Sequence, residues 1–247
     1  TGTGKTAAFG IPMIEQLNSE QHDVQGLILV PTRELAMQVH RELERIAQFQ
    51  HVNITACYGG QPIFKQISRL QRGSQIVVGT PGRILDHLDR GTLRLDRLRS
   101  LVLDEADEML RMGFIDDVNH IFEQLPAERQ GLLFSATMPK PIRKLSEQYM
   151  RDPAEVTIRL QATTSPNIRQ RFLKRRRNEK LETLIGILEV EDFDAMLVFA
   201  RTKNSSSEIA ERLLSKGYAA EALNGDMPQM LREKTVGRLR EGKLDIL

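Results

Sequence analysis

Short, continuous apolar runs alternate with amphipathic helical patterns along the chain, and this alternation restricts its fold more than any other feature. Between the runs, apolar residues recur on one helical face, as Leu35, Val39, Leu43 and Ile46 do. Leu231, Val236 and Leu239 share a face in the same way, so we expect them to be buried. Runs without polar alternation are typical of strands buried on both faces of a parallel sheet. The pattern predicts an α/β fold built from βαβ units. The apolar runs are residues 27–30, 54–57, 76–78, 101–103, 132–134, 196–199, 219–223 and 245–247.

One segment without periodicity divides the chain. Residues 161–167, with the sequence QATTSPN, are small and polar and include a proline, which is typical of a linker. The 247 residues are enough for two domains of ordinary size. We therefore expect one domain at residues 1–160 and a second at residues 168–247. The basic run 174–177, KRRR, follows the linker and is either a solvated surface or part of a binding face.

The overall charge does not by itself indicate a nucleic-acid partner. The chain has 35 basic and 33 acidic residues, a net charge of +2, so any binding surface for an anion must be a local arrangement. The single cysteine, Cys57, cannot form an internal disulfide and fits a reducing compartment. We expect it to be buried. No apolar run approaches the roughly 20 residues that cross a bilayer, so we expect a soluble cytoplasmic protein without a membrane partner.

The chain opens with TGTGKT, followed by a segment that can continue as a helix. A phosphate-binding loop needs glycines so that backbone N–H groups curl around phosphate oxygens, a lysine that reaches the β and γ phosphates, and a hydroxyl that binds Mg²⁺. Gly2, Gly4, Lys5 and Thr6 fit these roles. Taken alone, this half-motif also fits a glycine-rich turn before a helix. The expected ATP-binding residues are Thr1, Gly2, Thr3, Gly4, Lys5 and Thr6.

An acidic tetrad, DEAD, directly follows the apolar run 101–103. Ligands of open α/β sheets bind at the carboxyl ends of strands, where a carboxylate can hold Mg²⁺. We expect Asp104 to bind the metal together with Thr6. Glu105 is suited to orient the attacking water and accept its proton. The alternative is an acidic N-cap of the next helix.

Two hydroxyl residues, Ser135 and Thr137, directly follow the apolar run 132–134. At a strand's carboxyl end they can bond to the acidic tetrad and to the surroundings of the metal. As an isolated tripeptide, Ser-Ala-Thr would equally well begin a helix. The position of this tripeptide after a further apolar run, downstream of the acidic tetrad, favours the interpretation that it bonds to the tetrad.

With these three motifs in order, the chain resembles the DEAD-box family of ATP-dependent RNA helicases, which is named after the tetrad. The stretches VVGTPGRILDHL and LVLDEADEMLRMGF are most similar to its bacterial cold-shock branch, the DeaD/CsdA type. Further motifs of the family are PTREL at 31–35, a double glycine at 59–60, TPGR at 80–83, FARTK at 199–203, LNGDM at 223–227, and the pair Gln229 and Arg232.

The resemblance implies two RecA-like P-loop lobes with parallel sheets, ATP and Mg²⁺ between them, and RNA across both. It implies that Asp107, Ser135 and Thr137 couple the nucleotide state to lobe closure, and that a few RNA base pairs melt locally. Ribosomal or mRNA-decay complexes are further partners by resemblance. The RNA contacts implied are Pro31, Thr32, Arg33, Gly60, Thr80, Gly82 and Arg83 in the first lobe, and Arg201, Thr202 and Arg232 in the second.

The chain begins inside one motif and stops inside an apolar run, so we expect both lobes to be incomplete. The family's adenine-reading segment would precede Thr1, and its arginine-finger motif would follow Leu247. Because an arginine finger contributes about 10³–10⁵ in rate, we expect negligible ATP hydrolysis by this piece alone. Three other readings remain: a DNA-translocating helicase of the same superfamily, a non-catalytic RNA-binding scaffold, and a P-loop ATPase acting on proteins.

Overall fold

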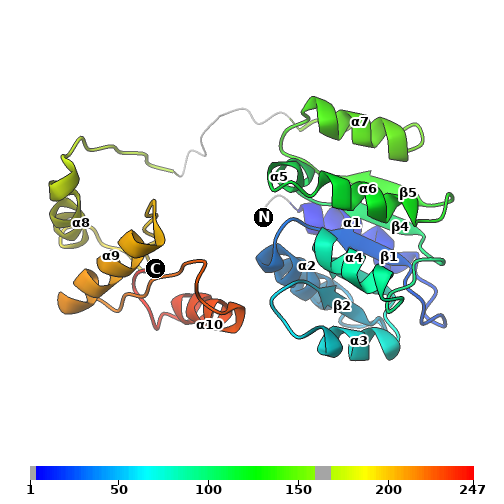
Figure 1. Ribbon diagram of the computed structural model, residues 1–247, viewed down its shortest axis with the longest axis horizontal. Helices are drawn as coiled ribbons and strands as arrows, with labels where there is room; N and C mark the ends of the chain where they lie inside the picture. The colour runs from blue at the N-terminus through cyan, green and yellow to red at the C-terminus, as the bar shows by residue number, and fades with distance from the viewer. Residues whose placement is uncertain (1–3, 159–167) are drawn as a thin grey trace. The chain divides into compact units, whose positions relative to one another are not determined.

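The protein consists of two compact units, Thr1–Val156 and Thr157–Leu247 (Figure 1). The computed structural model describes residues 4–158 and 168–247. The expected linker, residues 161–167, lies outside the described residues.

A five-stranded, entirely parallel sheet forms the centre of the first unit, with strand order β2-β3-β1-β4-β5. Leu27 of the central strand aligns with Val77 on one side and Leu101 on the other. The predicted α/β class with parallel strands is confirmed. The strands are β1 (Gly26–Leu29), β2 (Ile54–Cys57), β3 (Ile76–Gly79), β4 (Ser100–Leu103) and β5 (Gln130–Leu133).

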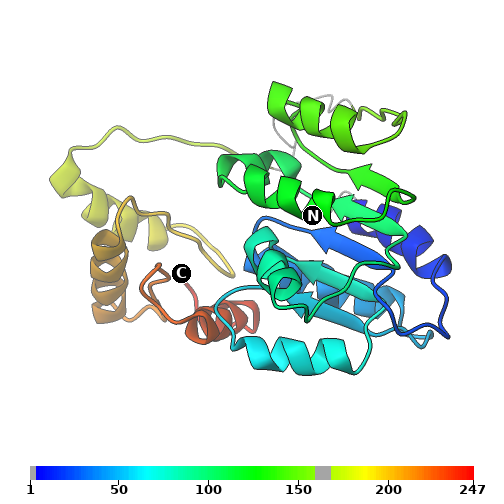
Figure 2. The ribbon, with the colours of Figure 1, turned by 45° about the vertical axis from the view of Figure 1, so that its right-hand side comes forward.

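Helices cover both faces of this sheet (Figures 1 and 2). Phe9 and Leu43 pack with Ile28 on one face, whereas Ile84 and Ile121 pack on the other, so the inner strands β1, β3 and β4 have no solvated side. The helices are α1 (Lys5–Glu15), α2 (Arg33–Ile46), α3 (Ile63–Gln71), α4 (Pro81–Asp89), α5 (Ala106–Arg111), α6 (Ile115–Glu123) and α7 (Lys140–Tyr149).

Burial on both faces holds for the inner strands and fails for β5. All residues of β1, β3 and β4 are buried, but Gln130 of β5 is exposed and the rest of that strand is only half-buried. Within the described chain β5 pairs on one side only, with β4, which leaves it less covered.

The carboxyl ends of β2 and β3 are tightly packed against α4. A Cβ at Gly79 would lie 2.7 Å from the backbone oxygen of Cys57 and would also collide with Ile84, so only glycine permits this approach. Cys57 is buried, as expected, and this burial raises the pKa of its thiol to about 12. It is therefore a packing residue rather than a nucleophile.

The second unit repeats the α/β pattern on a smaller scale. Single parallel bridges join Ile246 to Met196 and to Ala220, so the last apolar run lies between the other two. Ile185 and Leu213 pack against these runs from the helices. The helical elements are a 3₁₀ turn (Arg177–Glu179), α8 (Lys180–Leu188), α9 (Lys203–Ser215) and α10 (Gln229–Arg240).

Two expectations for the second unit are wrong. The run 196–199 is not buried on both faces, since Leu197 and Phe199 are 58% and 93% exposed. Helix α10 buries Thr235, whose hydroxyl donates a hydrogen bond to Glu221 Oε2 at 3.0 Å, and leaves Leu231 45% exposed.

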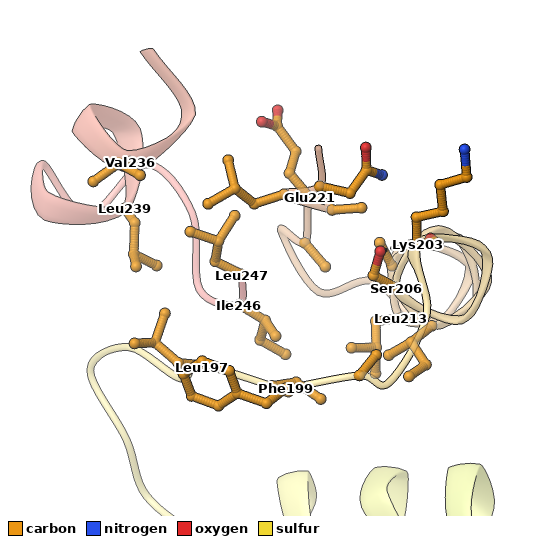
Figure 3. Close-up of a pocket in the computed structure, with 18 of the residues that line it drawn as sticks. Leu197, Phe199, Lys203, Ser206, Leu213, Glu221, Val236, Leu239, Ile246 and Leu247 are labelled. Atoms are coloured by element: carbon orange, nitrogen blue, oxygen red, sulfur yellow. Dashed lines mark hydrogen bonds between the residues drawn. The ribbon is translucent and has the colours of Figure 1, made fainter. Parts of the chain in front are cut away.

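The uncovered side of these runs borders a cavity of about 620 Å³ (Figure 3). Leu197 and Phe199 line it from the run 196–199, and Leu213 lines it from α9. Val236 and Leu239 line it from α10.

Candidate functional site

Lysine 5 and aspartate 104, ninety-nine residues apart in the sequence, meet at the carboxyl end of the sheet. Helix α1 begins at Lys5, directly after Gly4, whose φ of 74° is left-handed and suits glycine. The Lys5 Nζ atom lies 4.0 Å from Asp104 Oδ1, just after β4. Thr6 follows in the first turn of α1, where backbone N–H groups lack helical partners. The predicted residues Thr1, Gly2 and Thr3 lie outside the described residues.

The carboxylate of Asp104 is only 4% exposed. Burial raises its pKa, while the Lys5 ammonium and the Glu105 N–H, which donates to Oδ1 at 3.0 Å, act in the opposite direction. A nearby cation stabilises the ionised form of a desolvated carboxylate. One carboxylate and the Thr6 hydroxyl are oxygen donors suited to Mg²⁺, which binds through few protein ligands and keeps several waters. The residues present therefore fit the expected metal.

Glu105 has a strained backbone. Its φ of 55° and ψ of 49° place it in the left-handed region at the N-cap of α5. Non-glycine residues adopt this conformation rarely, and such strain costs on the order of 1–3 kcal/mol and clusters at functional sites. This observation separates Glu105 from an ordinary helix-capping residue, since its side chain makes no capping hydrogen bond.

Asp107 connects the ends of β4 and β5. Its Oδ2 accepts hydrogen bonds from the Thr137 hydroxyl at 2.7 Å and the Thr137 N–H at 3.1 Å, and its own N–H donates to Ser135 Oγ at 3.2 Å. Ser135 Oγ donates in turn to the Thr137 carbonyl at 2.6 Å. Burial tends to raise the pKa of Asp107, but the hydrogen bonds from Thr137 and Ser135 outweigh it and lower the pKa. The structure thus brings the three predicted coupling residues together.

The predicted RNA-contacting residues after β1 and β2 lie in neighbouring loops. Thr32 is the N-cap of α2 and accepts a hydrogen bond from the Leu35 N–H at 3.2 Å. The adjacent Arg33 guanidinium lies over Gly59, where a Cβ would approach its Nη2 to 3.3 Å. Gly60 is exposed and has a φ of 82°. Pro31, by contrast, is buried.

The loop after β3 begins α4. Thr80 is buried at its N-cap and Gly82 is exposed in the first turn. The Arg83 side chain is only 14% exposed, because it turns toward the protein. Its Nη1 donates to the Gln61 carbonyl at 3.3 Å and to Gln66 Oε1 at 3.1 Å.

A threonine N-cap like that of α2 in the first unit also begins a helix in the second unit. Thr202 is the N-cap of α9, accepts a hydrogen bond from the Ser205 N–H at 3.1 Å, and has φ and ψ of −128° and 153°, against −126° and 155° for Thr32. Arg201 is exposed beside it. Arg232 is half-buried on α10 and donates to Gln229 Oε1 at 3.2 Å.

An ion pair joins two further motifs of the second unit. Lys203 Nζ lies 2.7 Å from Asp226 Oδ2, linking the segment FARTK to LNGDM.

Sequence reasoning missed a buried polar network behind Arg83. Gln66 and His87 are 2% and 0% exposed, and His87 Nε2 lies 3.0 Å from Gln66 Oε1. The only sequence signal was the spacing of Arg83 and His87, which are four residues apart and therefore share a face of α4.

A parallel sheet with a glycine-lysine helix start facing a buried carboxylate defines the RecA-like class of P-loop nucleoside triphosphatases. Comparison with known families agrees. The DEAD/DEAH box helicase model matches residues 1–145, and the helicase conserved C-terminal domain matches residues 179–247. The chain belongs to the DEAD/DEAH box helicase family.

Curated relatives match over the whole chain. The ATP-dependent RNA helicase CshA of Listeria monocytogenes is 49% identical, with 100% of this chain and 48% of the relative covered. The ATP-dependent RNA helicase DeaD of Escherichia coli K12 is 52% identical, with 100% and 39% covered. The chain therefore spans about half or less of the length of these relatives.

Among solved structures, a DEAD box protein from the hyperthermophile Methanococcus jannaschii is 43% identical with a TM-score of 0.63, over 100% of this chain and 66% of that chain. The predicted RecA-like fold and the predicted family are confirmed. None of the helices in the described part of the chain is both long and apolar enough to span a membrane.

Proposed function

We propose that the protein is an RNA-stimulated ATPase that separates short RNA duplexes, using ATP with Mg²⁺. The observation that carries this proposal is the 4.0 Å approach of Lys5 Nζ to Asp104 Oδ1 beside the N-terminus of α1. It joins the phosphate-binding and metal-binding halves of one nucleotide site. The names of the relatives, ATP-dependent RNA helicases, support the same activity.

Each residue of this site has a distinct task in the proposal. The Lys5 ammonium binds the β and γ phosphates, and the free N–H groups that begin at Gly4 bind phosphate oxygens. Thr6 and Asp104 hold Mg²⁺, which neutralises phosphate charge when it is bound. Glu105 orients the attacking water and accepts its proton. Thr1, Gly2 and Thr3 are assigned to ATP binding by their sequence motif.

RNA binding is assigned to the loops that follow the strands. Backbone N–H groups and arginines at such positions bind phosphates without reading base sequence. This fits a chain whose net charge is only +2, since binding then depends on a local set of donors. The assigned residues are Pro31, Thr32, Arg33, Gly60, Thr80, Gly82, Arg83, Arg201, Thr202 and Arg232.

The proposed setting is the cytoplasm, during a stress response such as cold shock, with ribosomal or mRNA-decay complexes as partners. The resemblance of VVGTPGRILDHL and LVLDEADEMLRMGF to the bacterial cold-shock branch of the family supports this setting. A single buried thiol, Cys57, is compatible with a reducing compartment.

The test is ATP hydrolysis by the complete protein with Glu105→Gln. We expect RNA-stimulated turnover to fall by about 10²–10⁴-fold while ATP binding persists, because the variant loses the proton acceptor and keeps Lys5 and Asp104. Glu108→Gln, one turn further along α5, is the matched control and should retain activity. A Glu105→Gln protein as active as the parent would favour a non-catalytic scaffold, and equal stimulation by DNA would favour a DNA-translocating helicase.

A further inference from the structure

Helix α3 carries a buried glutamine that joins three elements. Gln66 Nε2 donates to the Tyr58 carbonyl at 2.9 Å, just after β2. Its Oε1 lies 3.1 Å from Arg83 Nη1 and 3.0 Å from His87 Nε2, both on α4. Gln66 is 2% exposed, so each of these hydrogen bonds is made away from solvent.

Only one orientation of the Gln66 amide satisfies these partners. Arg83 is always a donor and the Tyr58 carbonyl is always an acceptor. A flipped amide would set its NH₂ group against the Arg83 donors and its oxygen against the Tyr58 oxygen. The amide oxygen therefore faces α4, and His87 must carry a proton on Nε2 to donate to it.

The other side of His87 is satisfied as well. Its Nδ1 lies 2.9 Å from Thr92 Oγ1. Burial lowers the pKa of His87, and the Arg83 charge acts in the same direction, so the ring is held neutral. A neutral ring with its proton on Nε2 leaves Nδ1 as an acceptor for the Thr92 hydroxyl, which also lies 3.1 Å from the His87 carbonyl oxygen. His87 is fixed from both sides by groups that the proposed chemistry does not use.

Arg83 also connects this network to the double-glycine loop. Nη1 and Nη2 donate to the Gln61 carbonyl at 3.3 and 3.4 Å, directly after Gly59 and Gly60. With the bond to Gln66, three of the five guanidinium N–H groups are hydrogen-bonded to the protein, and Nε lies 3.7 Å from Asp86 Oδ2. The Gln61 side chain adds a bond to the Tyr58 hydroxyl at 2.5 Å, so the loop is held at both ends.

We propose that Gln66 and His87 are positioning residues for RNA binding, which hold the Arg83 guanidinium against the Gln61 backbone. Arg83 then fixes the Gly59–Gly60 loop in addition to the RNA contact proposed for it above. This inference rests on the proposed RNA-binding function of that loop.

The test uses the complete protein, a labelled single-stranded RNA and a non-hydrolysable ATP analogue, with RNA affinity measured over a series of salt concentrations. Gln66→Met keeps the length of the side chain and removes its hydrogen bonds. We expect it to weaken RNA binding by about tenfold, comparable to one lost hydrogen bond, with an unchanged salt slope because no phosphate contact is lost. Arg83→Gln should weaken binding more and lower the salt slope by about 0.7, because it also removes the proposed phosphate contact. Adding Gln66→Met to it should weaken binding no further.

Two controls keep the result specific. Gln71→Met, on the exposed side of α3, should bind RNA like the parent. His87→Gln keeps an N–H donor for Gln66 and should bind better than His87→Phe, which lacks one. If Gln66→Met does not fold, the comparison of His87→Gln with His87→Phe tests the same hydrogen-bonded network. Thermal unfolding shows whether each variant is folded.

Several outcomes would overturn the inference. A salt slope that falls by about 0.7 in Gln66→Met would show that this substitution removes a phosphate contact rather than the order of the loop. Unchanged RNA affinity in Gln66→Met, or an equal loss of ATP-analogue binding, would also refute the positioning role. A parent protein that does not bind RNA at all would instead refute the proposed function.

Discussion

The burial of Asp104 disfavours the ionised form of its carboxyl group. It is almost inaccessible, and the compensating Lys5 ammonium is 4.0 Å away rather than in direct contact. The folded carboxyl group therefore holds its proton to a higher pH than it does in the unfolded chain. At neutral pH the ionised form destabilises the fold, which is the common relation between an active site and stability.

For this reason, Asp104→Asn should unfold at a higher temperature than the parent at pH 7 while losing ATP hydrolysis. The amide oxygen still accepts the Glu105 N–H, and the buried charge is gone. The difference should shrink as the pH falls through the folded pKa of Asp104 towards its unfolded value of about 4, because both forms are then neutral. Thermal unfolding at several pH values measures this, with the exposed Asp96→Asn as control. A variant that is less stable at pH 7 would contradict the argument.

At the scale of elements, the ends of β4 and β5 are tied by Asp107, Ser135 and Thr137. Backbone bonds support the same junction, since the Ala106 N–H donates to the Phe134 carbonyl at 3.1 Å. The hydrogen bonds lower the pKa of Asp107, so its contribution to stability is present above the unfolded pKa and is lost as the pH falls through the folded pKa. A junction between two strand ends can transmit a change at the acidic tetrad to β5.

Replacing both hydroxyl residues, Ser135→Ala with Thr137→Val, tests this transmission. We expect RNA unwinding to fall by about tenfold, within the usual range of coupling energies, and ATP hydrolysis to change much less. The measurement is the ratio of the two rates in the complete protein. Ser215→Ala, an exposed hydroxyl of α9, is the control. Equal losses of unwinding and hydrolysis would remove the coupling role.

At the scale of the whole molecule, the chain consists of two units that each have their own hydrophobic core. Residues 168–176 of the second unit form an exposed segment without helix or strand. Such segments open at little cost in free energy and are the first to be cut by proteases. The basic run that begins at Lys174 lies in this segment.

Brief trypsin digestion should therefore cut first at Arg169, Lys174 or Arg175 and leave a protected fragment that contains the first unit. Mass spectrometry of the early products measures this. Arg111 is the internal control, because its side chain is 66% exposed but its backbone is part of α5. Cleavage at Arg111 at the same rate would show that the first unit is not a stable body.

The sequence by itself determined the class of fold and the meeting of the two halves of the nucleotide site. Continuous apolar runs require cover on both faces, which predicts parallel strands between helices. The carboxyl ends of such strands share one edge, so Asp104 and Ser135 had to lie near each other. The approach of Lys5 follows from a motif whose local spacing carries its geometry.

Only the tertiary structure decided how individual side chains are used. The left-handed backbone of Glu105, the inward turn of Arg83, and the burial of Thr235 in place of Leu231 have no signature in local periodicity. Gln66 meets His87 across 21 residues through hydrogen bonds that form only after α3 and α4 have packed. Periodicity records which face of an element is buried, whereas the partner of a buried polar group depends on elements brought together from distant parts of the chain.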